Sequence, residues 1–448
     1  MNFGLMAHVL RYRAKLRGHE RWSRAELEAR QQAALAELRA FAVERSPFYA
    51  RFHRGFANRP LAELPVLTKA RLMDSFDEVV TDRKLKLAEI ETYLHALQDD
   101  ELFRDRYWVS ATSGSSGRRS IIPSDLTEWA TIIASYGRAN EWSGVRITPF
   151  RRARLAVVSS RTAFHQSLRV GQSIQMPRVE TCRLDAAAPL VEILQALDDF
   201  KPDVLVAYAS MIRVLAEEQI AGRLHITPRS VNCSSEVLSP EGRDRAATAW
   251  GVPPFNVYAA TETGGIAAEC EQHSGMHLFE DLVIPEVVGD DYRPVAPGVA
   301  GSRLLVTVLF SRTLPLIRYE LTDRVRLATE ACACGRPFRL LAEIEGRTDD
   351  VIELPAAAGG SVRLHPIVFH RALDLLRASA WQVRQERDGI RVLIQAPELE
   401  LDGAALSRSI AAAITAAGAV ATPVLVERVP EIPAGASGKR PLVVAFKA

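Results

Sequence analysis

Short apolar runs alternate with amphipathic stretches along the middle of the chain. Between about residues 126 and 345, helical patterns such as residues 190–200 (LVEILQALDDF) and 239–251 (SPEGRDRAATAWG) separate these runs. Strands that alternate with helical segments are typical of βαβ units, whose strands pair mostly in parallel. The pattern predicts a mostly parallel sheet, with strands at residues 155–160, 203–210, 230–235 and 254–260.

Helical spacing also dominates the first 45 residues, which are rich in Ala, Glu, Arg and Leu. This helical region is predicted to end before Ser46-Pro47, because a residue that precedes proline disfavours the α conformation. Residues 57–70 carry two prolines and are predicted to form a loop. Thr68 is placed to cap the helix that follows.

The pattern changes again toward the C-terminus. Residues 303–327 predict strands joined by turns and hence a small β-rich subdomain. After GRTDD at residues 346–350 comes a turn-rich stretch, and the last part of the chain has the pattern of a small α+β unit. We therefore expect a mixed α/β fold with a large N-terminal domain at residues 1–345, a hinge at 346–350 and a C-terminal α+β domain at 351–448.

Composition narrows the class of protein. A chain of 448 residues is too long for one core, so at least two domains are expected. The net charge is only +2, from 56 basic and 54 acidic residues, which argues against a nucleic-acid binder. We find no membrane span and expect no signal peptide. The five cysteines, an odd number, favour a reducing, cytoplasmic location over a disulfide scaffold.

One loop has the composition of a phosphate-binding segment. Residues 110–120 place hydroxyl side chains, two glycines and two arginines between two β-prone stretches. Glycines let backbone N–H groups approach phosphate oxygens, hydroxyls add donors and arginines neutralise charge. The segment lacks the Gly-Lys-Ser/Thr of a Walker A motif. A surface loop of small polar residues is the alternative interpretation.

Two further segments carry groups that suit a nucleotide. Tyr258 can cover an aromatic base, and Thr261 beside Glu262 can serve a phosphate and its Mg²⁺. Asp323 can accept hydrogen bonds from ribose hydroxyls. Each has a plainer interpretation: Thr-Glu as a helix N-cap, and Asp323 as the partner of a neighbouring arginine.

The order and spacing of these segments resemble the adenylate-forming superfamily, which comprises acyl-CoA ligases, luciferases and peptide-synthetase adenylation domains. The matching segments are TSGSSG at 112–117 (phosphate loop), VYAATE at 257–262, Asp323 (ribose), EGRTDD at 345–350 (hinge) and PAGASGKRP at 433–441 (catalytic lysine loop).

Within that superfamily the chain most resembles the phenylacetate–CoA ligase-like branch, and the resemblance covers nearly the whole chain. The segments that carry this resemblance are SPFYARFHRG at 46–55, LPVLTKARLMDSF at 64–76, NCSSEVLSPEGR at 232–243, residues 269–286 and PLIRYELTD at 315–323.

The resemblance implies an enzyme that uses ATP and Mg²⁺ to activate a carboxylic acid as its acyl-adenylate, and then transfers the acyl group to CoA. The phosphates would be held by Thr112, Ser113, Gly114, Ser115, Ser116 and Gly117. The adenine would contact Ser235, Glu236, Tyr258 and Ala259, and the ribose Asp323. Thr261 and Glu262 would serve the α-phosphate and Mg²⁺, Lys439 the reacting groups, and Arg347 and Asp349 the hinge of a mobile C-terminal domain.

Several positions depart from the family pattern. Ala259 and Thr322 replace glycines, and Arg119 replaces the proline of the phosphate loop. Residues 353–366 also differ from the family segment that helps to form the thioester conformation. This last difference raises an alternative, in which the acyl group passes to a carrier protein, an amine or another acceptor. A non-catalytic nucleotide-binding homologue is a second alternative.

Four residues form a candidate zinc site. Cys270, His277, Cys332 and Cys334 supply three thiolates and an imidazole, which suit tetrahedral Zn²⁺ in a structural role. Similar positions in the phenylacetate–CoA ligase-like branch carry residues of this kind. His273 is a competing fourth ligand, and unpaired thiols with an incidental histidine are the alternative. Cys182 and Cys233 are expected to be buried small residues.

The acid pocket is expected beside Tyr208, Ser210 and Ala260. Tyr208 and the small pair Ala259 and Ala260 would admit a flat ring, so an aryl or arylacetic acid is the leading substrate class; core packing is the alternative role for these residues. The expected partners are this small-molecule acid and CoA or a carrier protein, with a homodimer as a possible assembly.

Overall fold

The computed structural model describes residues 3–112, 119–145, 152–173, 178–186, 188–347, 352–357, 359–364, 367–373, 376, 378, 380–396, 402–433 and 441–446. Residue contacts divide the chain into two compact units. Unit 1 comprises residues 1–153, 160–180 and 255–343, and unit 2 comprises residues 154–159, 181–254 and 344–448. Among the described helices, none combines the length and the apolar character needed to cross a membrane.

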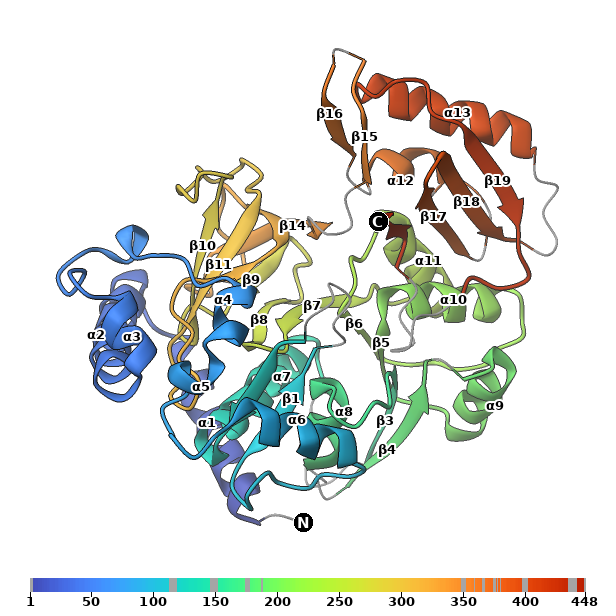
Figure 1. Ribbon diagram of the computed structural model, residues 1–448. Coiled ribbons are helices and arrows are strands. Elements are labelled where there is room, and N and C mark those ends of the chain that lie inside the picture. The colour runs from blue at the N-terminus through green and yellow to red at the C-terminus, as the bar shows by residue number, and fades with distance from the viewer. Residues whose placement is uncertain are drawn as a thin grey trace. The chain divides into compact units, whose positions relative to one another are not determined.

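Unit 1 begins with three helices whose ends follow from capping residues. These are α1 (Phe3–His19), α2 (Arg24–Arg45) and α3 (Pro47–Phe52). Ser23 and Glu26 form a capping box at the start of α2. α2 ends directly before Ser46-Pro47, as predicted, and Ser46 then caps α3, which packs against α2 (Figure 1).

The longest of the remaining described helices of unit 1 is α7 (Leu126–Trp142). Asp125 caps α7, and the α7 helix packs against α1 and β8. Thr68 caps α4 (Lys69–Asp74), as predicted. The others are a short 3-10 helix at Leu61–Glu63, α5 (Phe76–Val79), α6 (Leu87–Ala96) and α8 (Gln166–Ser173).

Three groups of strands complete unit 1. β1 (Trp108–Ala111) and β2 (Ile121–Ser124) form an antiparallel hairpin around the candidate phosphate loop. The antiparallel sheet β10-β11-β12 consists of Val283–Val288, Arg303–Val308 and Tyr319–Leu321. A further set has the order β13-β14-β9-β8-β7, formed by Asp323–Leu327, Leu340–Arg347, Met276–Leu278, Gly264–Glu269 and Phe255–Ala260. The strands predicted between residues 303 and 327 are therefore confirmed.

Unit 2 contains three of the four predicted strands, and the fourth, at residues 254–260, is β7 of unit 1, which pairs antiparallel with β8. β3 (Ala153–Ser159), β5 (Val204–Tyr208) and β6 (Ser230–Ser234) pair in parallel in the order β6-β5-β3, with β4 (Val179–Asp185) next to β3. Buried side chains of these strands share one core with the helices between them, α9 (Leu190–Phe200), α10 (Ala209–Ile220) and α11 (Pro240–Trp250). The mixed α/β fold is confirmed.

The C-terminal part of unit 2 has a core of its own, centred on Trp381 and Val383. Its sheet has the order β19-β18-β17-β20, with β17 and β18 antiparallel. α13 packs against β19 (Figure 1). The elements are β15 (Ile352–Pro355), β16 (Ser361–Leu364), α12 (Ile367–Leu373), β17 (Ala380–Glu386), β18 (Gly389–Gln395), α13 (Gly403–Ala416), β19 (Val424–Arg428) and β20 (Val443–Val444).

Within unit 2, two arginines from the parallel-sheet part bind main-chain carbonyls of the C-terminal part. Arg213 on α10 and Arg245 on α11 both donate to the Ala378 carbonyl, at 3.0 and 3.1 Å. Arg245 also donates to the Leu376 carbonyl at 2.8 Å. Glu217 and Glu241 form ion pairs with Arg245, and these pairs balance the charge of a largely buried guanidinium.

A buried ion pair joins α7 to the segment before β10 in unit 1. The Arg138 guanidinium donates to both carboxylate oxygens of Asp281, at 2.8 and 2.6 Å, and both side chains are almost fully buried. The His19 ring lies 2.6 Å from the same carboxylate. Despite desolvation, the Arg138 charge holds the pKa of Asp281 well below its usual range. Arg138 is therefore a main attachment point between these segments.

His53 at the end of α3 makes the stability of the protein depend on pH. The side chain is 6% exposed, and among the described residues neither ring nitrogen has a hydrogen-bond partner. Burial lowers the pKa of His53 to about 4. Between the ordinary histidine pKa and this lower value the unfolded chain binds a proton that the folded chain does not, so stability falls as the pH falls through that window.

We expect the free energy of unfolding to drop by about 2 kcal/mol through His53 when the pH is lowered from about 7.5 to about 5. The His53→Phe variant should lose this part of the pH dependence, because phenylalanine fills the site without titrating. Urea unfolding at both pH values measures the difference. His95→Phe, at an exposed position, is the control and should keep the wild-type pH dependence. An unchanged pH dependence in His53→Phe would exclude His53 as the cause.

Candidate active site

The candidate phosphate loop starts and ends at one point of the β1–β2 hairpin. The Thr112 N–H donates to the Ser120 carbonyl at 3.0 Å, and the Ser120 N–H donates to Thr112 Oγ1 at 2.9 Å. We call this pair the loop neck. The Arg119 guanidinium lies 4.6 Å from the centre of the Phe164 ring. Of the predicted phosphate-binding residues, Ser113, Gly114, Ser115, Ser116 and Gly117 lie outside the described residues.

Thr261 and Glu262 lie in the turn between β7 and β8, also in unit 1. Gln166 Nε2 donates to the Thr261 carbonyl at 2.9 Å, and Gln166 Oε1 accepts from the Tyr136 hydroxyl at 2.7 Å. The Glu262 carboxylate is 9% exposed and accepts a hydrogen bond from the Tyr319 hydroxyl at 3.0 Å. The turn is therefore held through its backbone and through its carboxylate.

Tyr258 and Asp323, predicted to contact adenine and ribose, are neighbours in unit 1. The Tyr258 hydroxyl donates to Asp323 Oδ2 at 2.9 Å. The register of β7 against β8 shifts between Tyr258 and Ala259, the position that departs from the family glycine. Such a bulge changes the direction of side chains at the end of a strand. Ala260, predicted to line the acid pocket, is buried at the end of β7.

The other described candidates belong to unit 2. Glu236 Oε2 accepts from the Ser210 N–H at 2.8 Å, so this carboxylate caps the N-terminus of α10, where an anion is favourable. Tyr208 belongs to the buried core of unit 2, whereas Ser235 is exposed and has a positive φ of 69°. Arg347 ends β14. Asp349 and Lys439 lie outside the described residues.

Tyr319 is the residue that the sequence analysis missed. Its hydroxyl lies 3.0 Å from Glu262 Oε1 and 3.3 Å from Ser120 Oγ, so it touches both the loop neck and the Thr-Glu turn. A signal was present in the sequence. Tyr319 and Asp323 are four residues apart in a strand-like run. Side chains alternate between the two faces of a strand, so the pattern predicts both on the same face.

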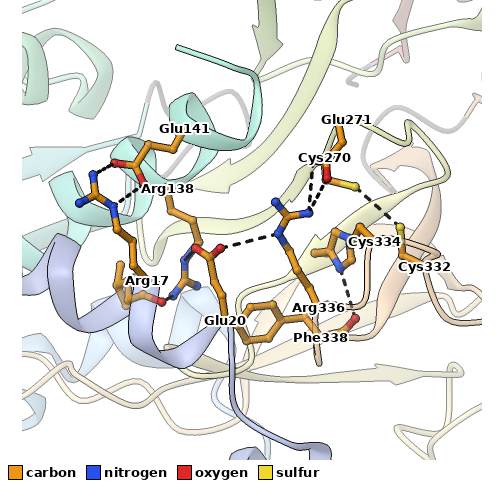
Figure 2. A network of polar contacts seen from close by, with 12 residues as sticks. Arg17, Glu20, Arg138, Glu141, Cys270, Glu271, Cys332, Cys334, Arg336 and Phe338 are labelled. Atoms are coloured by element: carbon orange, nitrogen blue, oxygen red, sulfur yellow. Dashed lines mark hydrogen bonds and ion pairs between the residues drawn. The ribbon is translucent and has the colours of Figure 1, made fainter. Parts of the chain in front are cut away.

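The four predicted zinc ligands come together in unit 1. The ligand atoms of Cys270, His277, Cys332 and Cys334 all lie within 4.8 Å of one another. Cys270 and Cys332 sulfurs are 3.7 Å apart, and the Cys334 sulfur is 3.2 Å from His277 Nε2 (Figure 2). The competing ligand His273 instead lies 3.0 Å from the Glu269 carboxylate. The structure therefore favours His277 as the fourth ligand.

The chemistry of this cluster suits a cation. His277 Nδ1 lies 3.3 Å from the Phe338 carbonyl, and a proton donated there leaves Nε2 as a lone-pair donor toward the thiols. Burial lowers the pKa of His277 to about 4, so the ring is neutral, as a ligand must be. Burial raises the pKa of the Cys270 thiol to about 12, and a bound Zn²⁺ would reverse this effect. No disulfide joins any of the cysteines.

The sequence and the fold of the chain are similar to those of adenylate-forming ligases. No protein-family model matches the chain. The phenylacetate–coenzyme A ligase of Thermus thermophilus is 28% identical over 344 residues, which cover 73% of this chain and 72% of the relative. The enzyme of the same name from Aromatoleum evansii is 25% identical over 357 residues, covering 74% and 75%.

Solved structures agree on the fold. A 2-hydroxyisobutyryl-CoA ligase in the postadenylation state, in complex with an acyl-AMP, superposes with a TM-score of 0.73 at 20% identity, covering 96% of this chain and 91% of that one. An anthranilate CoA ligase in complex with anthranoyl-AMP gives 0.52 at 18% identity, covering 74% and 64%. Over about three quarters of its length the chain is thus similar to phenylacetate–CoA ligases, and its fold is that of adenylate-forming CoA ligases.

Proposed function

We propose that this protein activates a carboxylic acid with ATP, releases pyrophosphate and transfers the acyl group from the acyl-adenylate to CoA. One observation carries the proposal. In unit 1, hydrogen bonds through Tyr319 connect the loop neck to Glu262 at the end of β7, the strand on which Tyr258 binds Asp323. A phosphate loop, a carboxylate for Mg²⁺ and a pair suited to a nucleoside are the parts that adenylation needs.

Adenylation joins two anions, the acid carboxylate and the α-phosphate. Their repulsion, and the charge that develops at phosphorus, make fixed positive charge effective in the transition state. Glu262 is suited to hold the Mg²⁺ that supplies part of this charge, because Mg²⁺ prefers one or two carboxylates together with phosphate oxygens. Thr261 is assigned to the α-phosphate and Lys439 to the carboxylate and α-phosphate.

The remaining assignments complete the ATP site. Residues 112–117 bind the phosphates, with Thr112 also closing the loop neck. Tyr258, Ala259, Ser235 and Glu236 serve the adenine and Asp323 the ribose. Residues 1–345 form the adenylation domain and residues 351–448 the C-terminal domain, and Arg347 and Asp349 belong to the hinge that moves Lys439 between the two half-reactions.

The acid is assigned to the aryl or arylacetic class, with Tyr208, Ser210 and Ala260 at the pocket. Two relatives are named for phenylacetate, which supports an aromatic acid. Residues 352–355 and 361–364 form a hairpin, β15–β16, at the segment that departs from the family pattern. This departure keeps a carrier protein or an amine as the alternative acceptor.

The proposed function is tested by acid-dependent exchange of labelled pyrophosphate into ATP. The panel contains benzoic, phenylacetic, cinnamic and short aliphatic acids, each with and without CoA. We expect exchange with aromatic acids and faster AMP release when CoA is present. If exchange occurs but CoA has no effect, the acceptor of the acyl group is not CoA. If a protein that binds ATP shows no exchange, adenylation of these acids is refuted.

We further propose that Cys270, His277, Cys332 and Cys334 hold a structural Zn²⁺ in this cytoplasmic enzyme. The donor set of three thiols and a neutral imidazole supports this assignment. When bound, the ion would join the end of β8, strand β9 and the loop between β13 and β14. Arg336 in that loop lies 3.7 Å from Glu20 and 3.3 Å from Glu271, so the same loop also carries ion pairs to neighbouring segments (Figure 2).

Chelation of the metal is expected to lower the thermal midpoint of unfolding by about 5 °C, corresponding to roughly 1–2 kcal/mol. The fluorescence of Trp142 should change, because its ring lies 5.5 Å from the His277 ring. The wild type should purify with about one zinc ion per chain, and Cys332→Ser should purify without it. Cys182→Ser, outside the cluster, should retain the ion. Metal-free wild-type protein with an unchanged midpoint would contradict the proposal.

A further inference from the structure

Tyr319 occupies a rigid position in unit 1. The residue is 1% exposed and starts β12, where it pairs with Val306 of β11. On its other side, the Leu67 N–H donates to the Arg318 carbonyl, and the Glu320 N–H donates to the Leu67 carbonyl, both at 3.0 Å. With the backbone bonded on both sides of the residue and the ring buried, the phenol has little freedom to move.

The Tyr319 hydroxyl connects two parts of the candidate site that are far apart in the sequence. It lies 3.0 Å from Glu262 Oε1 and 3.3 Å from Ser120 Oγ. A phenol has one proton, and the ionised carboxylate can only accept. The hydrogen bonds therefore run in one direction, from the Ser120 hydroxyl to the Tyr319 oxygen and from the Tyr319 hydroxyl to Glu262.

Ser120 brings the loop neck into this chain of hydrogen bonds. It is fully buried, and its main-chain N–H and carbonyl both bind Thr112 across the neck. A displacement of the neck is thus transmitted to the Tyr319 oxygen, and from there to the carboxylate. Three elements, the β1–β2 hairpin, β12 and the β7–β8 turn, meet at one phenol.

We propose that Tyr319 is a positioning residue that orients the Glu262 carboxylate for the cation of Mg²⁺–ATP and couples this orientation to the loop neck. The inference rests on the proposed function, which assigns Glu262 to that cation. The Tyr319 hydroxyl binds Glu262 Oε1 and so restrains the rotation of the carboxylate that would hold the cation. Tyr319 itself is not a catalytic residue, because it acts through Glu262 and Ser120.

The physical reason is the strict geometry of Mg²⁺. The ion demands nearly octahedral coordination at short distances, so a carboxylate that rotates freely must be ordered when the ion binds. A charge-assisted hydrogen bond to one oxygen fixes the carboxylate plane beforehand. Partners of this kind behind a metal ligand change metal affinity by about 10–100-fold when they are removed.

Tyr319→Phe is the central test, because phenylalanine keeps the ring and its packing and removes only the hydroxyl. We expect the Mg²⁺ concentration for half-maximal ATP binding, measured by calorimetry without any acid, to rise about tenfold. The same shift should appear in pyrophosphate exchange, and excess Mg²⁺ should restore most of the rate. A structural role alone would lower stability without this rescue.

Tyr292→Phe is the matched control. The Tyr292 hydroxyl donates to the Glu320 carboxylate at 2.9 Å, which is the same kind of hydrogen bond. Glu320 follows Tyr319 in the chain, and this bond does not involve Glu262. This variant should retain the wild-type Mg²⁺ dependence. Ser120→Ala should raise the Mg²⁺ requirement less than Tyr319→Phe does. In the double variant the two effects should not add, because both act through one hydroxyl.

The outcomes separate this inference from the proposed function. If Tyr319→Phe binds Mg²⁺–ATP as the wild type does, the inference is overturned, whatever the activity. If its requirement rises but equals that of Tyr292→Phe, the effect is not specific to Glu262 and the inference also fails. Because the binding measurement needs no acid, it supports or overturns the role of Tyr319 even if the wild type exchanges pyrophosphate with none of the acids.

Discussion

Replacing Lys439 with alanine is expected to reduce acid-dependent pyrophosphate exchange by about 10²–10³-fold while ATP binding stays nearly unchanged. The lysine lies in the Gly- and Pro-rich segment PAGASGKRP. Its charge is needed when the carboxylate oxygen and the α-phosphate approach each other, because both are anions. Under the proposed function, ATP is bound mainly by the phosphate loop, Glu262 and the Tyr258–Asp323 pair, so the variant should lose little ATP affinity.

The measurement combines exchange rates with equilibrium binding of ATP. Lys439→Arg keeps the positive charge but replaces the ammonium with a planar guanidinium, so it should retain part of the exchange rate. Lys84→Ala, at an exposed position of unit 1, should exchange like the wild type. Wild-type turnover by Lys439→Ala would remove this lysine from the reaction and with it the role given to the C-terminal segment.

The second large effect is on stability. Arg138→Ala is expected to lower the free energy of unfolding by about 3–5 kcal/mol, because it leaves the fully buried Asp281 carboxylate without its bidentate partner. The guanidinium also lies 4.9 Å from the centre of the Phe279 ring, so packing is lost together with the charge. Removing one member of a buried pair costs far more than breaking an exposed one.

Urea unfolding at neutral pH measures this loss. Arg59→Ala is the control, since Arg59 and Glu63 are largely exposed and 3.3 Å apart, and it should change stability by less than about 1 kcal/mol. The low pKa of Asp281 adds a pH signature. A carboxyl with a depressed pKa stabilises the fold above its ordinary pKa and loses this contribution as the pH falls below it. Arg138→Ala should therefore show a weaker acid-dependent loss of stability than the wild type.

Local rules account for the features that were predicted correctly. The Ser46-Pro47 pair and Thr68 set helix ends through bonds to neighbours three residues away or through the ring of proline, so a short window contains the whole signal. The parallel strands of unit 2 and its helices at residues 190–200 and 239–251 were predicted from apolar spacing, which is also a local signal. The proximity of Cys270, His277, Cys332 and Cys334 was predicted because thiols and imidazoles are few and chemically distinctive.

Long-range contacts account for what was missed. Arg138 and Asp281 are 143 residues apart, and each is an ordinary residue in its own segment. Tyr319 was not selected beside Asp323, because one of the contacts that make it important is to Ser120, 199 residues away in the chain. Glu236 was assigned to adenine from its motif, whereas its cap on α10 depends on how β6 and α10 pack. Such roles follow from tertiary structure and leave no periodic pattern in the chain.

The arginines of α10 and α11 bind main-chain groups, not side chains, of the C-terminal part of unit 2. Arg213 and Arg245 donate to the carbonyls of Leu376 and Ala378, and every residue has such a carbonyl. Substitutions in the accepting segment can therefore accumulate as long as the backbone path is kept, while the two arginines tolerate little change. A C-terminal part from a diverged relative should accept the same hydrogen bonds if it keeps this backbone path.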